Sequence, residues 1–207
     1  MKSSKRKEKE HKHKVPIYKQ TPSICASSWC TIFSIFVVFS AFIWACIEIE
    51  LQGKNGWAEN LETSSLGSSK NSPTIYHVFM AIFIITMFNL AFIFNPSYFS
   101  WRNELFVLSL MCIWFLFEDV FWFVLNPYYG FKHIGDAWWH VKWQDVPIIY
   151  AILPLISFFL AAISGYAFTY LKSLFFLALG FGIVLAIAPL YQMAYKASHK
   201  CTSPTPH

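Results

Sequence analysis

The sequence predicts an all-α protein, a polytopic membrane bundle of five transmembrane helices. Of its 207 residues, 56% are hydrophobic and only 13% are charged, whereas a soluble domain usually has about 25% charged residues because water must hydrate its surface. Long stretches without Lys, Arg, Asp or Glu recur along the chain, and each is close to the roughly 20 residues that a helix needs to cross a bilayer. These features exclude a soluble globular domain, a disordered chain and a disulfide-stapled secreted module.

Residues 1–28 are predicted to form a basic, disordered cytoplasmic tail. Residues 1–20 carry eight of the 16 Lys and Arg residues, so the net charge of +5 belongs to this tail and the remaining chain is slightly acidic. Such a tail attracts anionic lipid headgroups, by about 1 kcal/mol for each basic residue near the surface. No aromatic residues alternate with the basic ones of the tail, and we therefore do not expect it to bind nucleic acid.

The membrane domain is predicted to comprise residues 29–196, followed by a tail of residues 197–207. Backbone polar groups cannot remain unpaired in lipid, so each charge-poor stretch should be helical. Only Leu171-Lys172-Ser173 separates the last two stretches, which predicts an antiparallel hairpin that turns at Lys172. Pro154 and Pro189 should kink its two helices. The five predicted spans are residues 31–51, 74–95, 104–126, 147–170 and 173–195.

Two glycines in the fifth predicted span favour a close contact with another helix. Gly180 and Gly182 lie in the fifth span, and glycine lets the backbones of two transmembrane helices approach closely. We therefore expect the fifth helix to pack tightly against a neighbour on this side.

The distribution of basic residues predicts the orientation in the cell membrane, with the N-terminus cytoplasmic and the C-terminus non-cytoplasmic. In this orientation ten Lys and Arg residues lie on the cytoplasmic side and six on the other, as the positive-inside rule requires. The end of the first span and the loops of residues 52–73 and 127–146 then share the non-cytoplasmic side. We expect a functional site near that face.

Glu118 and Asp119 are the strongest candidates for catalytic residues because both lie inside the third predicted span. Placing an ionisable side chain in the hydrocarbon layer costs free energy, so each such residue in a spanning helix is a candidate for a functional site. At 1.5 Å per residue the pair lies about 10–12 Å from the end of its span. Neighbouring side chains on a helix point about 100° apart, so the two carboxyls can line one polar groove without aiming at one point.

Glu48, His77 and His140 are predicted to lie near the same membrane boundary. Glu48 is near the end of the first span, His77 near the start of the second, and His140 on the Trp-rich segment of residues 138–143. With Asp119 they form a candidate site for a divalent metal, Zn²⁺, Fe²⁺ or Mn²⁺, because imidazole and carboxylate groups ligate these ions. A bound metal would acidify a water for hydrolysis of a lipid or another membrane-borne substrate.

Two other functions fit the same residues. Glu118 and Asp119 could form the relay of a proton- or ion-coupled transporter, or pair with a partner helix in a non-catalytic assembly subunit. The sequence does not decide whether the protein is an enzyme. It has no HExxH, GxSxG, P-loop or dinucleotide-binding motif, and no internal repeat of the kind that inverted-repeat transporters show.

Three blocks of the sequence carry a resemblance to other proteins. They are Glu50–Thr63, Phe117–Gly130 and Trp138-Trp139-His140. They resemble an uncharacterised family of small prokaryotic polytopic membrane proteins. The resemblance implies only that the three blocks occur together. No activity is attached to the family.

Overall fold

The computed structural model describes residues 27–52, 64, 66, 74–134, 142–143 and 146–200, and these residues are almost entirely helical. Two short 3-10 turns and one antiparallel pair of two-residue strands connect the helices. The predicted all-α fold class is confirmed. The elements in order are α1 (Ser27–Gln52), α2 (Ile75–Phe94), η2 (Pro96–Tyr98), α3 (Trp101–Leu125), η3 (Phe131–His133), β1 (Lys142–Trp143), β2 (Val146–Pro147), α4 (Ile149–Ile163) and α5 (Ala167–Lys200).

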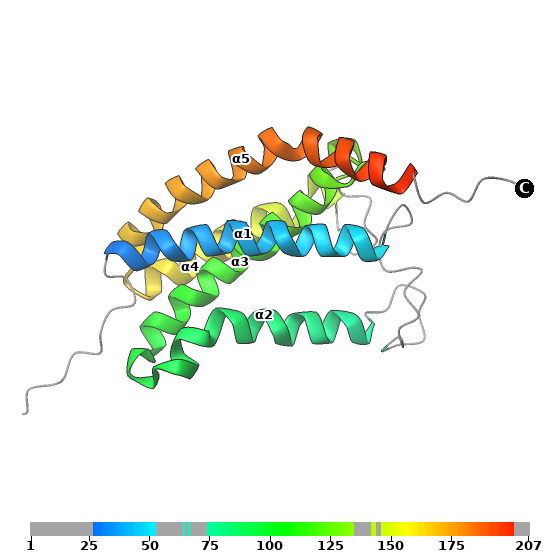
Figure 1. The fold of residues 1–207 in the computed structure, drawn as a ribbon. Coiled ribbons are helices and arrows are strands. Elements are labelled where there is room, and N and C mark those ends of the chain that lie inside the picture. Colours follow the sequence, from blue (N-terminus) through cyan, green and yellow to red (C-terminus); the bar gives the residue numbers. More distant parts are fainter. Residues whose placement is uncertain are drawn as a thin grey trace, which may run out of the picture.

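Four of these helices, α1, α2, α3 and α5, are long and apolar enough to cross a membrane. The architecture is that of a helical multi-pass membrane protein. Successive helices run in opposite directions (Figure 1). As a result α1, α3 and α5 end, and α2 and α4 begin, at one end of the bundle, which we call the site end. The described start of α1 and the described end of α5 lie at opposite ends.

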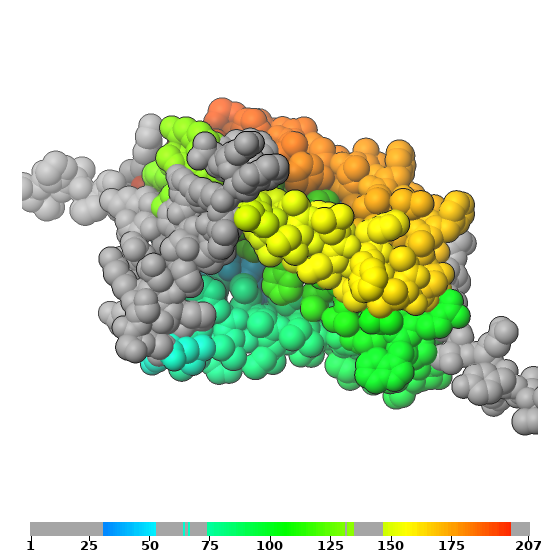
Figure 2. Space-filling view, turned by 180° about the vertical axis from the view of Figure 1, so that it is seen from behind, coloured from blue at the N-terminus to red at the C-terminus, as the bar shows by residue number. Residues whose placement is uncertain are grey.

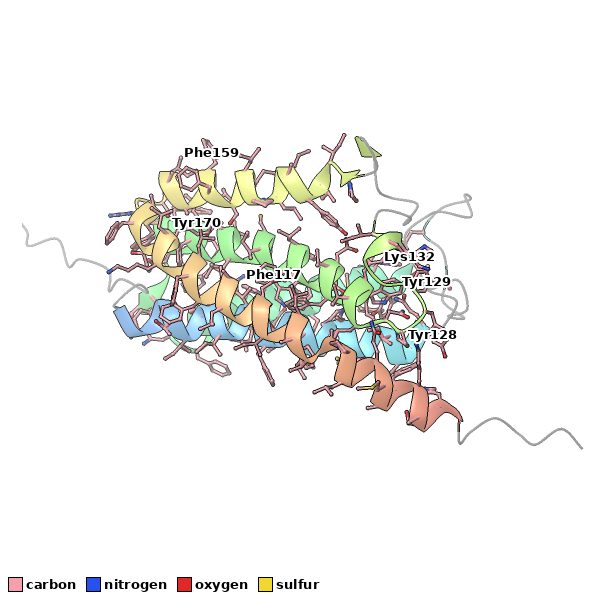
Figure 3. All side chains as sticks on the ribbon, turned by 90° about the horizontal axis from the view of Figure 1, so that it is seen from above. Phe117, Tyr128, Tyr129, Lys132, Phe159 and Tyr170 are labelled. Carbon is pink, nitrogen blue, oxygen red and sulfur yellow. The ribbon has the colours of Figure 1, made fainter. Side chains whose placement is uncertain are left out.

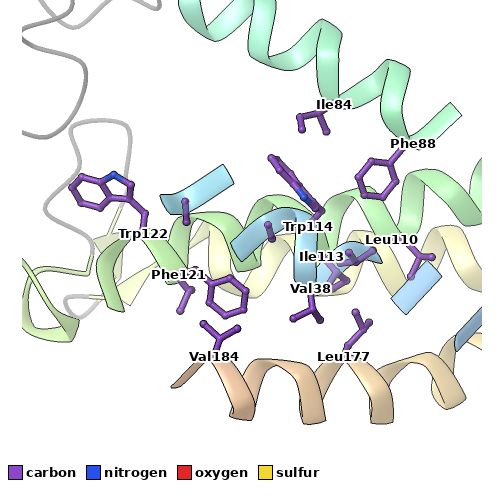
Figure 4. Packing of buried hydrophobic residues seen from close by; sticks show 14 of the residues in the cluster. Val38, Ile84, Phe88, Leu110, Ile113, Trp114, Phe121, Trp122, Leu177 and Val184 are labelled. Atoms are coloured by element: carbon purple, nitrogen blue, oxygen red, sulfur yellow. The ribbon is translucent and has the colours of Figure 1, made fainter. Parts of the chain in front are cut away.

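Helix α3 is the central helix of the bundle and packs against α1, α4 and α5. Its aromatic side chains fill the space between the helices. Trp114 is fully buried, and its indole Nε1 donates a hydrogen bond to Ser40 Oγ of α1 at 3.0 Å. Phe88 of α2 points toward Trp114 (Figure 4), while Phe117 lies between α3 and α5 (Figure 3).

Helices α1 and α5 approach each other closely at Gly180. A Cβ atom placed on Gly180 would lie 2.8 Å from Cγ2 and 2.9 Å from Cγ1 of Val38, well inside the distance of an ordinary carbon contact. A Cβ atom on Gly182 would meet nothing within 4 Å. Of the two glycines, Gly180 alone therefore mediates the close helix contact that the sequence predicts.

The turn between α4 and α5 differs from the prediction. The chain turns at residues 164–166, not at Lys172, so α4 is shorter than the predicted span of residues 147–170 and α5 is longer than predicted. Gly165 has φ +76°, a backbone conformation that glycine adopts without steric cost and that L side chains rarely adopt. Nε of Arg102 donates a hydrogen bond to the backbone oxygen of Ser164 at 2.9 Å and fixes this turn to the start of α3.

Lys172 does not end a helix because it lies in the second turn of α5 with its side chain exposed. Its ammonium lies 4.9 Å from the centre of the Phe168 ring. A long Lys side chain near a helix end can place its charge in the interface while its stem covers apolar surface. The charge therefore marks proximity to the interface and not a break in the helix. Pro154 and Pro189 both lie inside helices, as predicted.

Candidate functional site

Three carboxyl groups from two helices meet near the site end. Glu48 lies about one turn before the end of α1, and Glu118 and Asp119 lie about two turns before the end of α3. The carboxyls of Glu48 and Glu118 lie close enough to each other for a hydrogen bond, and Asp119 is near enough to interact electrostatically with both. Because an ionised carboxylate has no proton to donate, a hydrogen bond between these two acids requires one of them to be protonated. We call Glu48, Glu118 and Asp119 the carboxyl cluster.

Side chains from α1, α2 and α4 donate hydrogen bonds to the carboxyl cluster. The Tyr76 hydroxyl of α2 donates to Oε1 of Glu48 at 2.8 Å, and Nε1 of Trp44 donates to the same oxygen at 3.2 Å. The Tyr150 hydroxyl of α4 donates to Oδ2 of Asp119. The cluster therefore joins four helices of the bundle.

The local sequence explains how these donors reach the carboxyls. Trp44 and Glu48 are four residues apart on α1, a spacing that places both side chains on one helix face. Tyr76 and Tyr150 are each the second residue of a helix that begins at the site end. The alternating direction of the helices thus brings two first-turn tyrosines to the level of the acids.

Glu118 is the most buried member of the cluster, with 9% of its surface exposed. Its Oε1 atom has no hydrogen-bond partner among the described residues. A buried acceptor left without a partner costs about 1–3 kcal/mol, and such an atom in a folded protein requires an explanation.

Apolar side chains separate the carboxyl cluster from the opposite end of the bundle. Trp114, one turn below Glu118 on α3, is fully buried, and Phe88 of α2 and Ile113 of α3 are at most 4% exposed. The ring centres of Phe88 and Trp114 are 6.4 Å apart. The described residues therefore form a close-packed aromatic layer beneath the cluster.

The structure brings together three of the predicted site residues, namely Glu48, Glu118 and Asp119. His77 has a structural contact: its Nδ1 accepts a hydrogen bond from the backbone N–H of Thr74 at 3.2 Å, at the start of α2. His140 lies outside the described residues. Within the described ranges, no group of three or more His, Cys, Asp or Glu side chains could hold a metal ion.

Sequence reasoning missed the three donors, Trp44, Tyr76 and Tyr150. The four-residue spacing of Trp44 and Glu48 is a signal that could have identified one of them. Tyrosines in the first turn of a transmembrane helix are common because they suit the membrane interface. Nothing in the sequence distinguishes Tyr76 and Tyr150 from such interfacial residues.

Comparison with known proteins found no family model, no curated protein and no solved structure that matches the chain. The resemblance to a family of small prokaryotic membrane proteins thus stays a prediction. A fold alone does not assign a function, and the carboxyl cluster is the feature of this protein that points to one.

Proposed function

We propose that this multi-pass membrane protein uses its carboxyl cluster as a general acid–base site for a membrane-borne substrate near the non-cytoplasmic face. The observation that supports the proposal is the close approach of the carboxyls of Glu48 and Glu118, two acids on different helices. Two carboxyls at hydrogen-bonding distance can share one proton at a defined place. Positioned side chains that give and take protons are the basis of general acid–base catalysis.

Each group of the site has a distinct role in this proposal. Glu118 contacts the substrate, since its Oε1 atom is the acceptor without a partner. When the substrate transfers a proton to this atom, the net charge of the Glu48–Glu118 pair becomes more positive by one unit and that of the substrate becomes more negative by one unit. Tyr76 and Trp44 hold Glu48 in place through their hydrogen bonds. Asp119 is the second acid that meets the substrate.

One observation favours this proposal over the transporter considered for the sequence. The buried layer around Trp114 and Phe88 separates the cluster from the opposite end, which favours a site that serves one face over a relay through the membrane.

Lipid conversion in proteoliposomes tests the proposal. The purified protein is reconstituted in a total lipid extract of the expression host, and the lipids are followed over time by mass spectrometry. We expect one lipid class to change with wild type and with Glu104→Gln, and not with Glu118→Gln or Asp119→Asn. Glu104 is the matched control because it is also an acid of α3 but lies in the first turn, at the opposite end. An unchanged lipid profile with the wild type, or equal conversion by Glu118→Gln, would overturn the proposal.

Labelling with dicyclohexylcarbodiimide tests the shared proton directly. This apolar reagent forms adducts with protonated carboxyl groups inside membranes, and peptide mass spectrometry locates the adduct. We expect labelling of Glu48 or Glu118 and none of Glu50, whose side chain is exposed on α1. Labelling confined to Glu50 would show that the pair holds no reactive proton.

A further inference from the structure

One face of α3 stays uncovered although α3 is the central helix. Leu108, Cys112, Phe115 and Asp119 follow one another at spacings of four, three and four residues, so they share one face of the helix. All four are only partly buried. Most other residues of α3 near them, such as Trp114, are buried.

This face lies between α2 and α4. The contact of Trp114 with Phe88 marks the direction of α2, and the hydrogen bond from Ser157 Oγ to the backbone oxygen of Ser109 marks the direction of α4. At 100° per residue, the uncovered face lies between these two directions. Both helices pack on α3 and have no extensive contact with each other among the described residues.

The molecular surface is hollowed where α2 and α4 diverge. Figure 2 shows the hollow between α4, in yellow, and α2, in green-cyan, with α3, in green, and α1, in blue, visible at its bottom. We call it the α2–α4 groove and define its floor as Leu108, Cys112 and Phe115. Both walls are helices with exposed apolar residues. In a membrane the groove therefore opens sideways into the hydrocarbon layer.

The groove ends at the carboxyl cluster. Asp119 is the last residue of the uncovered face, and the two tyrosines that donate to the acids come from the two walls, Tyr76 from α2 and Tyr150 from α4. From Leu108 to Asp119 the groove is about 16 Å long at 1.5 Å per residue. This length is close to half of a hydrocarbon core of about 30 Å, which is about the length of one acyl chain.

We infer that the α2–α4 groove admits one acyl chain of an aminophospholipid from the membrane, and that the carboxyl cluster binds the primary ammonium of its headgroup. This inference rests on the proposed function and names its substrate class. An ammonium group has three hydrogen-bond donors and no acceptor, and the cluster offers it carboxylate oxygens, including the unpartnered Oε1 of Glu118. The charge of the cluster is thus complementary to an amine headgroup, and a trimethylammonium headgroup has no N–H to donate.

Photo-crosslinking in proteoliposomes tests the inference. Phosphatidylethanolamine with a diazirine on one acyl chain is the probe, and peptide mass spectrometry maps the adducts. We expect adducts on the residues of the groove floor, which excess unlabelled phosphatidylethanolamine reduces at least fivefold and phosphatidylcholine reduces less than twofold. Adducts on the lipid-facing residues of α5, such as Leu179, report ordinary boundary lipid, so both competitors should reduce them equally.

Two variants with a matched control sharpen this test. Leu108→Trp fills the groove and should abolish the adducts on its floor, whereas Leu179→Trp places the same side chain on an exposed position of α5 and should leave them unchanged. Glu118→Gln should remove the preference for phosphatidylethanolamine. Floor adducts absent from the wild type, or reduced equally by both lipids, would overturn the inference.

The outcomes separate this inference from the proposed function. If lipid conversion depends on Glu118 while the groove floor gives no adducts, the acid–base proposal stands and the α2–α4 groove is not the entry route. If the floor gives adducts selective for phosphatidylethanolamine and no lipid is converted, the groove is a lipid-binding site and the acid–base proposal is wrong.

Discussion

Replacement of Gly180 by alanine should separate α1 from α5 and destabilise the protein. The new Cβ atom would lie 2.8, 2.9 and 3.2 Å from Cγ2, Cγ1 and Cβ of Val38, whereas carbon atoms in contact are about 3.5–4.0 Å apart. Relief of this overlap needs a local displacement of about 1 Å, and overpacking of this kind costs about 1–3 kcal/mol. Alanine recovers about 0.5–1 kcal/mol of helix propensity. The expected net loss is therefore about 0–2.5 kcal/mol, with a central value of about 1 kcal/mol.

Two further variants provide the controls. Gly182→Ala makes the same chemical change two residues away, where a Cβ atom meets nothing within 4 Å, and it should stabilise the protein by about 0.5–1 kcal/mol. Val38→Ala removes the two methyl groups that the Gly180→Ala side chain would strike. The double variant should be more stable than the sum of its single effects predicts, with a coupling of about 1–2 kcal/mol.

Reversible unfolding in mixed detergent and dodecyl sulfate micelles, followed by circular dichroism, measures these free energies of unfolding. The reasoning fails if Gly180→Ala is as stable as Gly182→Ala, or if the effects at Gly180 and Val38 are additive. Either result would mean that α1 and α5 do not touch at this point.

Three other perturbations test the turn, the core and the site. Gly165→Ala should lower the free energy of unfolding by about 1–2 kcal/mol because the residue must keep a positive φ, and the same unfolding assay measures it. In a double-mutant cycle, Ser40→Ala and Trp114→Phe should show a coupling of about 0.5–1.5 kcal/mol for their hydrogen bond, and additive effects would contradict that bond. Tyr150→Phe removes a hydrogen-bond donor to Asp119 of the carboxyl cluster. It should slow lipid conversion about tenfold, which corresponds to an increase of about 1.4 kcal/mol in the activation free energy. An unchanged rate would exclude a positioning role for Tyr150.

The sequence predicted five helices because charge is expensive in a bilayer, and four of the five, all except α4, are long and apolar enough to cross one. Stretches without charge therefore showed where the helices lie. The same criterion misplaced the turn between α4 and α5, since it relied on Lys172. A lysine near a helix end can reach the interface, whereas Gly165 provides the positive φ of the turn itself.

The convergence of the acids was predictable, and their hydrogen-bond donors were not. Alternating helix directions bring Glu48, Glu118 and Asp119 to one end whatever the details of packing. The donors depend on how the helices rotate about their axes, and the hydrophobic pattern of a helix that is apolar on nearly all sides leaves that rotation undetermined. Tyr76 and Tyr150 therefore emerge as site residues only from the three-dimensional structure.

The length of α4 has a consequence for the membrane around the protein. Its 15 residues extend over about 22 Å, which is less than a hydrocarbon thickness of about 30 Å. A bilayer accommodates such hydrophobic mismatch by becoming locally thinner. Thinning beside α4 would bring lipid headgroups several ångströms deeper on the side where Tyr150 holds Asp119, and would shorten the path of a headgroup from the leaflet surface to the acids.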